Sequence, residues 1–135
     1  YEISACLVGS EMCIRDSSRV MLASKVVLGN ADGVDTLVFD EVDAGVGGST
    51  ARALAGVLAD LAATHQVIVV THLAQVAVMA DKHYVVSKEP GDVPQTHLDE
   101  VTGEARTAEI ARMLSGDQSE ASLAHAKQML EEARG

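Results

Sequence analysis

Aromatic residues are scarce in this sequence. Two Tyr, one Phe and no Trp make up 2% of the 135 residues, although 47% of the residues are hydrophobic. The core must therefore be built from Ala, Val and Leu, a composition that suits helices packed on a sheet better than a β-sandwich. A chain of this length holds one domain, or the larger part of one.

Basic residues are also few, 10 against 20 acidic ones, so the formal net charge is −10. Phosphate backbones repel such a surface, which makes this segment a poor candidate for a DNA-binding face. No apolar run reaches the length needed to span a bilayer. The only cysteines are Cys6 and Cys13, and no signal-peptide pattern opens the sequence, so a cytoplasmic location is expected.

The hydrophobic pattern predicts alternating strands and helices. Continuously apolar runs at residues 36–39 and 66–71 predict two strands buried on both faces. A third strand at 83–87 and an exposed hairpin partner at 95–101 follow. Helices are predicted at 18–30, after a cap at Ser49 or Thr50, at 73–80, at 107–114 and at 119–134, with Ser119 as the cap. This order indicates an α/β fold with a mainly parallel sheet flanked by helices.

Two adjacent carboxylates, Asp40 and Glu41, end the first predicted strand in the segment TLVFDE. Ligands bind at the carboxyl ends of strands in open α/β sheets, so both residues stand where a site forms. Successive strand residues point to opposite faces, and the two roles should therefore differ. We expect Asp40 to join a Mg²⁺ shell through water and Glu41 to face an attacking water. A strand that merely ends in solvated acids is the alternative.

Two further features favour a site. Asp43 begins the glycine-rich turn DAGVGG, which is flexible enough to bring backbone close to a partner or ligand. A plain helix-entry loop is the other interpretation of this turn. His72 directly follows the second predicted strand, which places its imidazole at the same sheet edge as Asp40 and Glu41 in a parallel sheet. The remaining histidines, interpreted as structural or surface residues, are His65, His83, His97 and His125.

The segments TLVFDEVDAGVGG and HQVIVVTHLAQVAVMAD resemble the ATP-binding-cassette ATPases. The resemblance is closest to DNA-repair members related to the SMC proteins, which join a split ATPase head to a coiled coil. It runs from about Ser18 to Arg134 and includes EIARMLSG and ASLAHAKQML in the tail. The resemblance implies that residues 18–135 form the C-terminal part of an ABC-type P-loop ATPase head.

The same resemblance implies a role for each candidate residue. Asp40 corresponds to the Walker B magnesium carboxylate, Glu41 to the catalytic carboxylate, and His72 to the switch histidine that senses the γ-phosphate. The implied cofactors are ATP and Mg²⁺. The implied partners are a second ATPase head in a homodimer and DNA, bound through the full-length protein rather than this acidic segment. The implied D-loop supplies the cofactor-binding positions Asp43, Gly45, Gly47 and Gly48.

The sequence also departs from the family pattern. A P-loop needs Gly-x-x-x-x-Gly-Lys before a Ser or Thr, and no Gly-Lys pair occurs in these 135 residues. The Ser-Gly-Gly-Glu signature loop belongs just before Ser18, where Cys13 to Asp16 stand instead. Residues 1–17 resemble adapter sequence read in frame, and we expect a non-native leader there; a divergent N-terminus is the alternative. The phosphate-binding loop and the coiled coil are expected upstream in the intact protein.

The function implied by the resemblance is ATP binding and hydrolysis by dimerised heads in DNA double-strand-break repair and recombination. One alternative is another cassette ATPase, such as a transporter subunit, which we would expect to differ after Val86 and in the D-loop. A second alternative is a non-catalytic module that keeps the fold for dimerisation, which the missing P-loop favours if the chain is complete.

Overall fold

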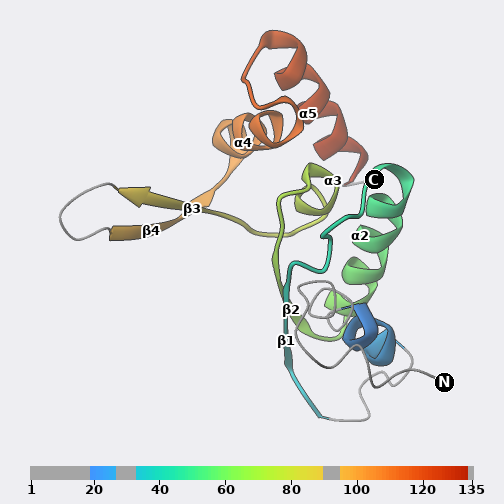
Figure 1. The fold of residues 1–135 in the computed structure, drawn as a ribbon. Helices are drawn as coiled ribbons and strands as arrows, with labels where there is room; N and C mark the ends of the chain where they lie inside the picture. Colours follow the sequence, from blue (N-terminus) through green and yellow to red (C-terminus); the bar gives the residue numbers. More distant parts are fainter. Residues whose placement is uncertain (1–18, 27–32, 90–94, 134–135) are drawn as a thin grey trace. The chain divides into compact units, whose positions relative to one another are not determined.

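The computed structural model describes residues 19–26, 33–89 and 95–133 (Figure 1). The expected leader at residues 1–17 and the position of the signature loop lie outside these ranges. The chain divides into two compact units, Tyr1–Thr71 and His72–Gly135, which are treated one at a time below. Within the described ranges, no helix is both long and apolar enough to cross a membrane.

The first unit is built around a parallel pair of strands. β1 (Thr36–Asp40) pairs with β2 (Gln66–Val70), and Asp40 stands opposite Val70 in the register. The connection between the strands contains α2 (Gly48–Ala62), as a parallel crossover requires. Residues 19–26 are helical, within the predicted helix at 18–30. The predicted pairing of two neighbouring parallel strands is confirmed.

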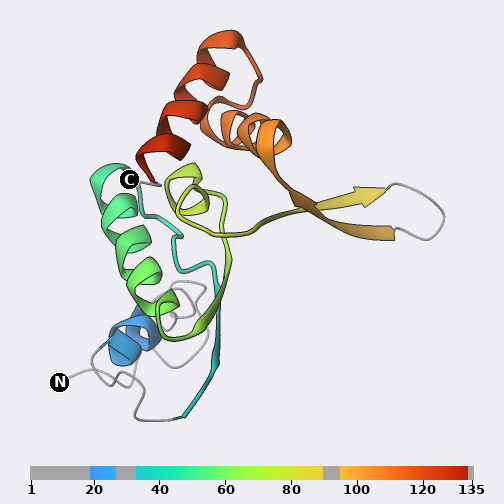
Figure 2. The ribbon, with the colours of Figure 1, turned by 180° about the vertical axis from the view of Figure 1, so that it is seen from behind.

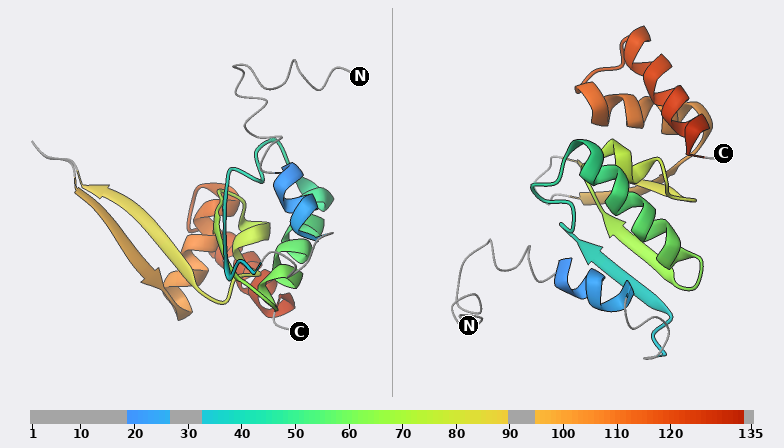
Figure 3. Two further views of the ribbon diagram at one scale, coloured as in Figure 1. Left: turned by 90° about the horizontal axis from the view of Figure 1, so that it is seen from below. Right: turned by 90° about the vertical axis from the view of Figure 1, so that its right-hand side faces the viewer.

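The prediction that these strands are buried on both faces is wrong. Leu37 and Phe39 are buried, whereas Val38, Ile68 and Val70 are 56%, 46% and 57% exposed. Strand residues alternate between the two faces of a sheet, and α2 lies over one of them (Figure 3). The residues of the other face are the exposed ones, so each strand alternates despite its continuous apolar sequence.

Helix α2 presents small and branched apolar side chains to the interior. Its buried residues recur at helical spacing and are Ala51, Ala55, Leu58 and Leu61. The predicted cap at Ser49 or Thr50 is wrong, because the N-cap is Gly47, which has no side chain to cap the helix. The backbone enters the helix through Gly48, whose φ of 56° only glycine adopts at little cost, so the turn geometry replaces a side-chain cap.

In its described residues, the second unit contains a hairpin and three helices. Strand β3 (His83–Glu89) pairs antiparallel with β4 (Gln95–Val101), which runs almost directly into α4 (Figures 1 and 2). The described strands thus form one parallel and one antiparallel pair, so the α/β class is confirmed but a mainly parallel sheet is not. The helices are α3 (Ala74–Ala77), α4 (Gly103–Ser115) and α5 (Glu120–Glu132).

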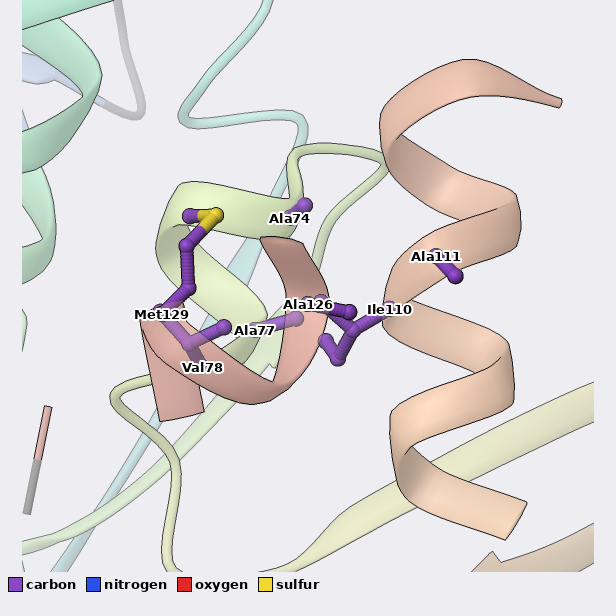
Figure 4. Close-up of a cluster of buried hydrophobic side chains, with 7 residues drawn as sticks. All are labelled: Ala74, Ala77, Val78, Ile110, Ala111, Ala126 and Met129. Atoms are coloured by element: carbon purple, nitrogen blue, oxygen red, sulfur yellow. The ribbon is translucent and has the colours of Figure 1, made fainter. Parts of the chain in front are cut away.

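A compact apolar cluster joins these three helices (Figure 4). Alanines make up more than half of its members, so the helices approach closely around Ile110, which is fully buried. Helix α4 begins at Gly103 and not at the predicted residue 107. Its first residues are exposed and carry no apolar periodicity, so the sequence pattern does not reveal them. The cluster consists of Ala74, Ala77, Val78, Ile110, Ala111, Ala126 and Met129.

The turn between α4 and α5 is held by one carboxylate. Asp117 Oδ1 accepts hydrogen bonds from Ser122 Oγ at 2.7 Å and Ser115 Oγ at 2.9 Å. The backbone N–H of Ser119 donates to the same oxygen at 3.2 Å, and Ser119 caps α5, as predicted. These hydrogen bonds, of which that from Ser122 has the largest effect, lower the pKa of Asp117 from its ordinary 3.8 to about 2.

The lowered pKa of Asp117 makes its contribution to stability dependent on pH. The contribution is present above the ordinary pKa of 3.8 and is lost as pH falls through about 2. We predict that Asp117→Asn lowers the melting temperature at neutral pH and flattens its pH dependence between about 4 and 2. Thermal unfolding followed by circular dichroism measures both effects. Asp99→Asn, on the exposed face of β4, is the control; equal slopes for Asp117→Asn and the parent would contradict the assignment.

Candidate functional site

Asp40 and Glu41 lie at the carboxyl end of β1, as predicted. Asp40 is the last residue of the strand, and Glu41 is the first residue after it. Both residues are exposed and therefore accessible to a ligand. Glu41 has a φ of 53° and is the one non-glycine residue with positive φ in the described ranges. This conformation is costly for a residue with a Cβ, and such strain concentrates at functional sites.

The glycine-rich turn after Glu41 has a buried base and an exposed rim. Val42 is fully buried, and the N–H of Ala44 donates to the Glu41 carbonyl at 3.1 Å. Gly45 and Gly48 have φ of 71° and 56°, in the left-handed region that favours glycine. Gly47, with φ of −155°, is in extended backbone that other residues adopt as readily. Backbone geometry therefore accounts for two of the three glycines, while their binding of a cofactor stays a prediction.

Asp43 is the buried charged residue of this turn, with 1% of its surface exposed. The hydroxyl of Thr71 donates a hydrogen bond to Asp43 Oδ2, and the Asp43 carbonyl accepts from the Val46 N–H at 2.9 Å. A buried carboxylate is costly unless donors satisfy it, so the Thr71 bond stabilises the turn. The bond ties the chain after β1 to the chain after β2. Asp43 thus has a structural contact, and its predicted role with a cofactor remains a prediction.

Arg19 is a contact of this turn that the sequence did not indicate. Its Nε donates to the Val42 carbonyl at 3.5 Å, and its Nη2 donates to the Ala44 carbonyl. A single Arg near the start of a predicted helix forms no local sequence motif. Its contacts are with a turn more than 20 residues farther along the chain, so a local pattern cannot predict them. The hydrogen bond from Thr71 to Asp43 is likewise not indicated by the sequence, although Thr71 directly follows β2 and so lies at the edge where Asp43 is found.

His72 is the first residue of the second unit and is exposed. It directly precedes Leu73, the N-cap of α3. The Leu73 carbonyl accepts from the N–H groups of Val76 and Ala77 at 3.0 and 3.1 Å, so His72 is one residue away from hydrogen-bonded helix. The predicted gathering of His72 with Asp40 and Glu41 involves both units and stays a prediction.

The residues at the end of β1 fit a magnesium ion better than an all-protein metal site. In the part of the chain that the structure describes, no three His, Cys, Asp or Glu side chains converge to hold a metal. Mg²⁺ needs no such group, because it keeps several waters and is held by one or two carboxylates together with substrate phosphates. An exposed Asp40 at the strand end meets that requirement.

Comparison with known proteins identifies relatives for most of the chain. The chain is 52% identical over 115 residues to "DNA repair protein RecN" of Treponema pallidum, covering 84% of this chain and 20% of that protein. It is 55% identical over 114 residues to the protein of the same name from Deinococcus radiodurans, again 84% of this chain and 20% of the relative. For the Streptomyces coelicolor RecN the identity is 50% over 119 residues, 87% of this chain and 21% of the relative.

No protein-family model matches the chain. The chain spans 20–21% of the length of these three RecN relatives. Identities of 50–55% over 84–87% of the chain are nevertheless too extensive to come from one short motif. The chain is therefore identified as a C-terminal segment of the RecN family, which agrees with the resemblance carried by its motifs.

Proposed function

We propose that this segment supplies the hydrolytic carboxylates of an ATPase head that acts in DNA double-strand-break repair and recombination. The observation that carries the proposal is the Asp40–Glu41 pair at the carboxyl end of a parallel strand, with Glu41 held at a φ of 53°. The role in repair is supported by relatives named as DNA repair proteins. That similarity favours a repair ATPase over the transporter subunit considered from the sequence.

The proposed chemistry divides the work among three residues. Asp40 would hold a magnesium ion, and Glu41 would accept a hydrogen bond from the attacking water and orient it toward the γ-phosphate. His72 donates to a γ-phosphate oxygen, where negative charge must be stabilised in the transition state. When bound, Mg²⁺ would neutralise part of the charge on the phosphates. The strained backbone of Glu41 supports this assignment, since it fixes the direction in which the carboxylate leaves the strand.

The glycine-rich turn is the proposed contact with a second head. Gly45, Gly47 and Gly48 are exposed, while the neighbouring Val42 and Asp43 are buried and hold the base of the turn. An exposed backbone without side chains allows another chain or a nucleotide to approach closely. We propose that the second head of a homodimer contacts this exposed rim. DNA is bound by other parts of the full-length protein, in keeping with the net charge of −10 here.

The 135-residue chain alone should bind ATP weakly or not at all. Most of the affinity for phosphate in such sites comes from backbone N–H groups and the lysine of a P-loop, and the sequence has no Gly-Lys pair. Isothermal titration calorimetry with Mg²⁺ and ATP measures the affinity. A dissociation constant below about 1 μM would show that the phosphates are held by residues other than those proposed.

Substitutions of the two carboxylates in the full-length protein should have different effects. Glu41→Gln keeps the size of the side chain but removes its charge, so ATP binding should persist while turnover falls by roughly 10²–10⁴. Asp40→Asn should instead weaken the magnesium-dependent part of ATP binding. Steady-state hydrolysis and nucleotide affinity, measured with and without Mg²⁺, separate the two effects.

The matched control for Glu41→Gln is Glu131→Gln, an exposed carboxylate on α5 that should leave both quantities unchanged. Hydrolysis at the parental rate in Glu41→Gln would mean that the carboxylate is structural. The non-catalytic dimerisation module would then be the better account of this segment.

A further inference from the structure

Arg106, on α4, contacts carbonyl groups at and just after the end of α3. Its Nη2 donates to the carbonyl oxygens of Ala77 at 3.2 Å, Val78 at 3.3 Å and Ala80 at 2.6 Å. The last carbonyls of a helix have no partner within the helix, and they favour a nearby cation. The Ala77 carbonyl also accepts from the Ala80 N–H at 3.3 Å, so Arg106 adds a charged donor from a different helix to the end of α3.

Helix α3 depends on such contacts because it has only four residues, Ala74–Ala77. An isolated helix of that length is not stable in water, so tertiary contacts must hold it. Ile110 of α4 supplies apolar ones, in the cluster that buries Ala74, Ala77 and Val78 (Figure 4). Arg106 supplies the polar ones, one helical turn before Ile110 on the same helix.

His72 lies just before the other end of this short helix. Leu73 is the N-cap, and its carbonyl is bonded to the N–H groups of Val76 and Ala77. Arg106 bonds the Ala77 carbonyl, so one residue, Ala77, links the guanidinium to Leu73. The Arg106 guanidinium and Leu73, the residue that follows His72, are therefore joined by hydrogen bonds through the backbone of Ala77.

The surroundings of Arg106 differ from those of Arg112, farther along α4. Burial, and next the positive charge of Arg106, lower the pKa of His83, while Glu109 raises it. The guanidinium of Arg106 thus lies in a partly buried environment near the His83 ring. Arg112 is exposed and bonds Glu109 on its own helix, with Nε at 2.8 Å and Nη2 at 2.6 Å. Arg112 is therefore a matched control with the same charge on the same helix.

We propose that Arg106 is a positioning residue that holds α3, and through it His72, in the place required for ATP hydrolysis. The inference rests on the proposed function, because it takes His72 to act on the γ-phosphate. Arg106 acts through the backbone of α3 and not on the nucleotide. Arg106 of α4 then contributes to hydrolysis indirectly, since it fixes the segment that follows His72.

A double-mutant cycle in the full-length protein tests this proposal. Arg106→Gln should lower kcat by on the order of 10- to 100-fold, as expected for a displaced catalytic group, with ATP affinity changed less than about twofold. In a His72→Ala background the same substitution should have no further effect on kcat, because its target is gone. Arg106→Lys, which keeps the charge without the planar fork, should restore part of kcat. Arg112→Gln should match the parent.

The outcomes separate the inference from the proposed function. If His72→Ala hydrolyses ATP at the parental rate, the assignment of His72 fails, and the positioning role fails with it. If His72→Ala is impaired but Arg106→Gln lowers kcat by the same factor in both backgrounds, only the positioning role is overturned. The positioning role is also overturned if Arg106→Gln lowers ATP affinity by as large a factor as it lowers kcat.

Amide hydrogen exchange of the full-length protein gives a readout that does not depend on hydrolysis. Arg106→Gln should speed exchange in peptides covering residues 72–80, since the contacts of Arg106 Nη2 with the carbonyls of Ala77, Val78 and Ala80 are lost. Peptides from β3 and β4 should be unchanged, and Arg112→Gln should match the parent throughout. Unchanged exchange at 72–80 in Arg106→Gln would overturn the proposed role.

Discussion

The parallel register of β1 against β2 is the constraint on which the first unit depends. It places Asp40 opposite Val70, so the chain leaves both strands at the same edge of the sheet. The hydrogen bond between Thr71 and Asp43 forms at that edge and closes the turn after β1. A slip of one residue would turn the buried Leu37 and Phe39 toward the exposed face, so burial of these side chains enforces the register.

The turn that directly follows the candidate carboxylates is held by buried side chains and hydrogen bonds. Val42 and Asp43 are buried directly after Glu41, and Arg19 bonds the carbonyls on either side of Asp43. A reactive group needs such support, because small displacements of a catalytic side chain cost much of its effect. Glu41 itself is exposed, and its backbone has a positive φ that is costly for a residue with a Cβ. Such backbone strain is typical of functional sites, where the backbone orients a side chain.

The sequence predicted the elements that have strong local signals. The apolar run predicted β1 nearly to its end, and Ser119 marked the start of the last helix. The exposure of Val38 was not predictable, because an apolar run does not reveal which element covers each face of a strand. The glycine entry to α2 was missed for a related reason: a Ser or Thr near a helix start signals a cap only when the backbone conformation permits one.

For the candidate site, the residue types were predictable and the supporting contacts were not. Asp40 and Glu41 were identified because two acids after an apolar strand form a local pattern. The contacts of Arg19, Thr71 and Arg106 join residues that are distant in the sequence, and no local pattern announces them. The positive φ of Glu41 is a property of the folded turn, since glutamate has no preference for that conformation.

The most direct test of the central claim is the structure of the full-length protein with Glu41→Gln, bound to Mg²⁺ and ATP. The account predicts that the Asp40 carboxylate lies within one water of the magnesium ion. It also predicts that the side chain at position 41 and the imidazole of His72 both lie within hydrogen-bond reach of the γ-phosphate or the water in line with it. A nucleotide bound with Asp40 remote from the metal, or with His72 remote from the γ-phosphate, would contradict the account.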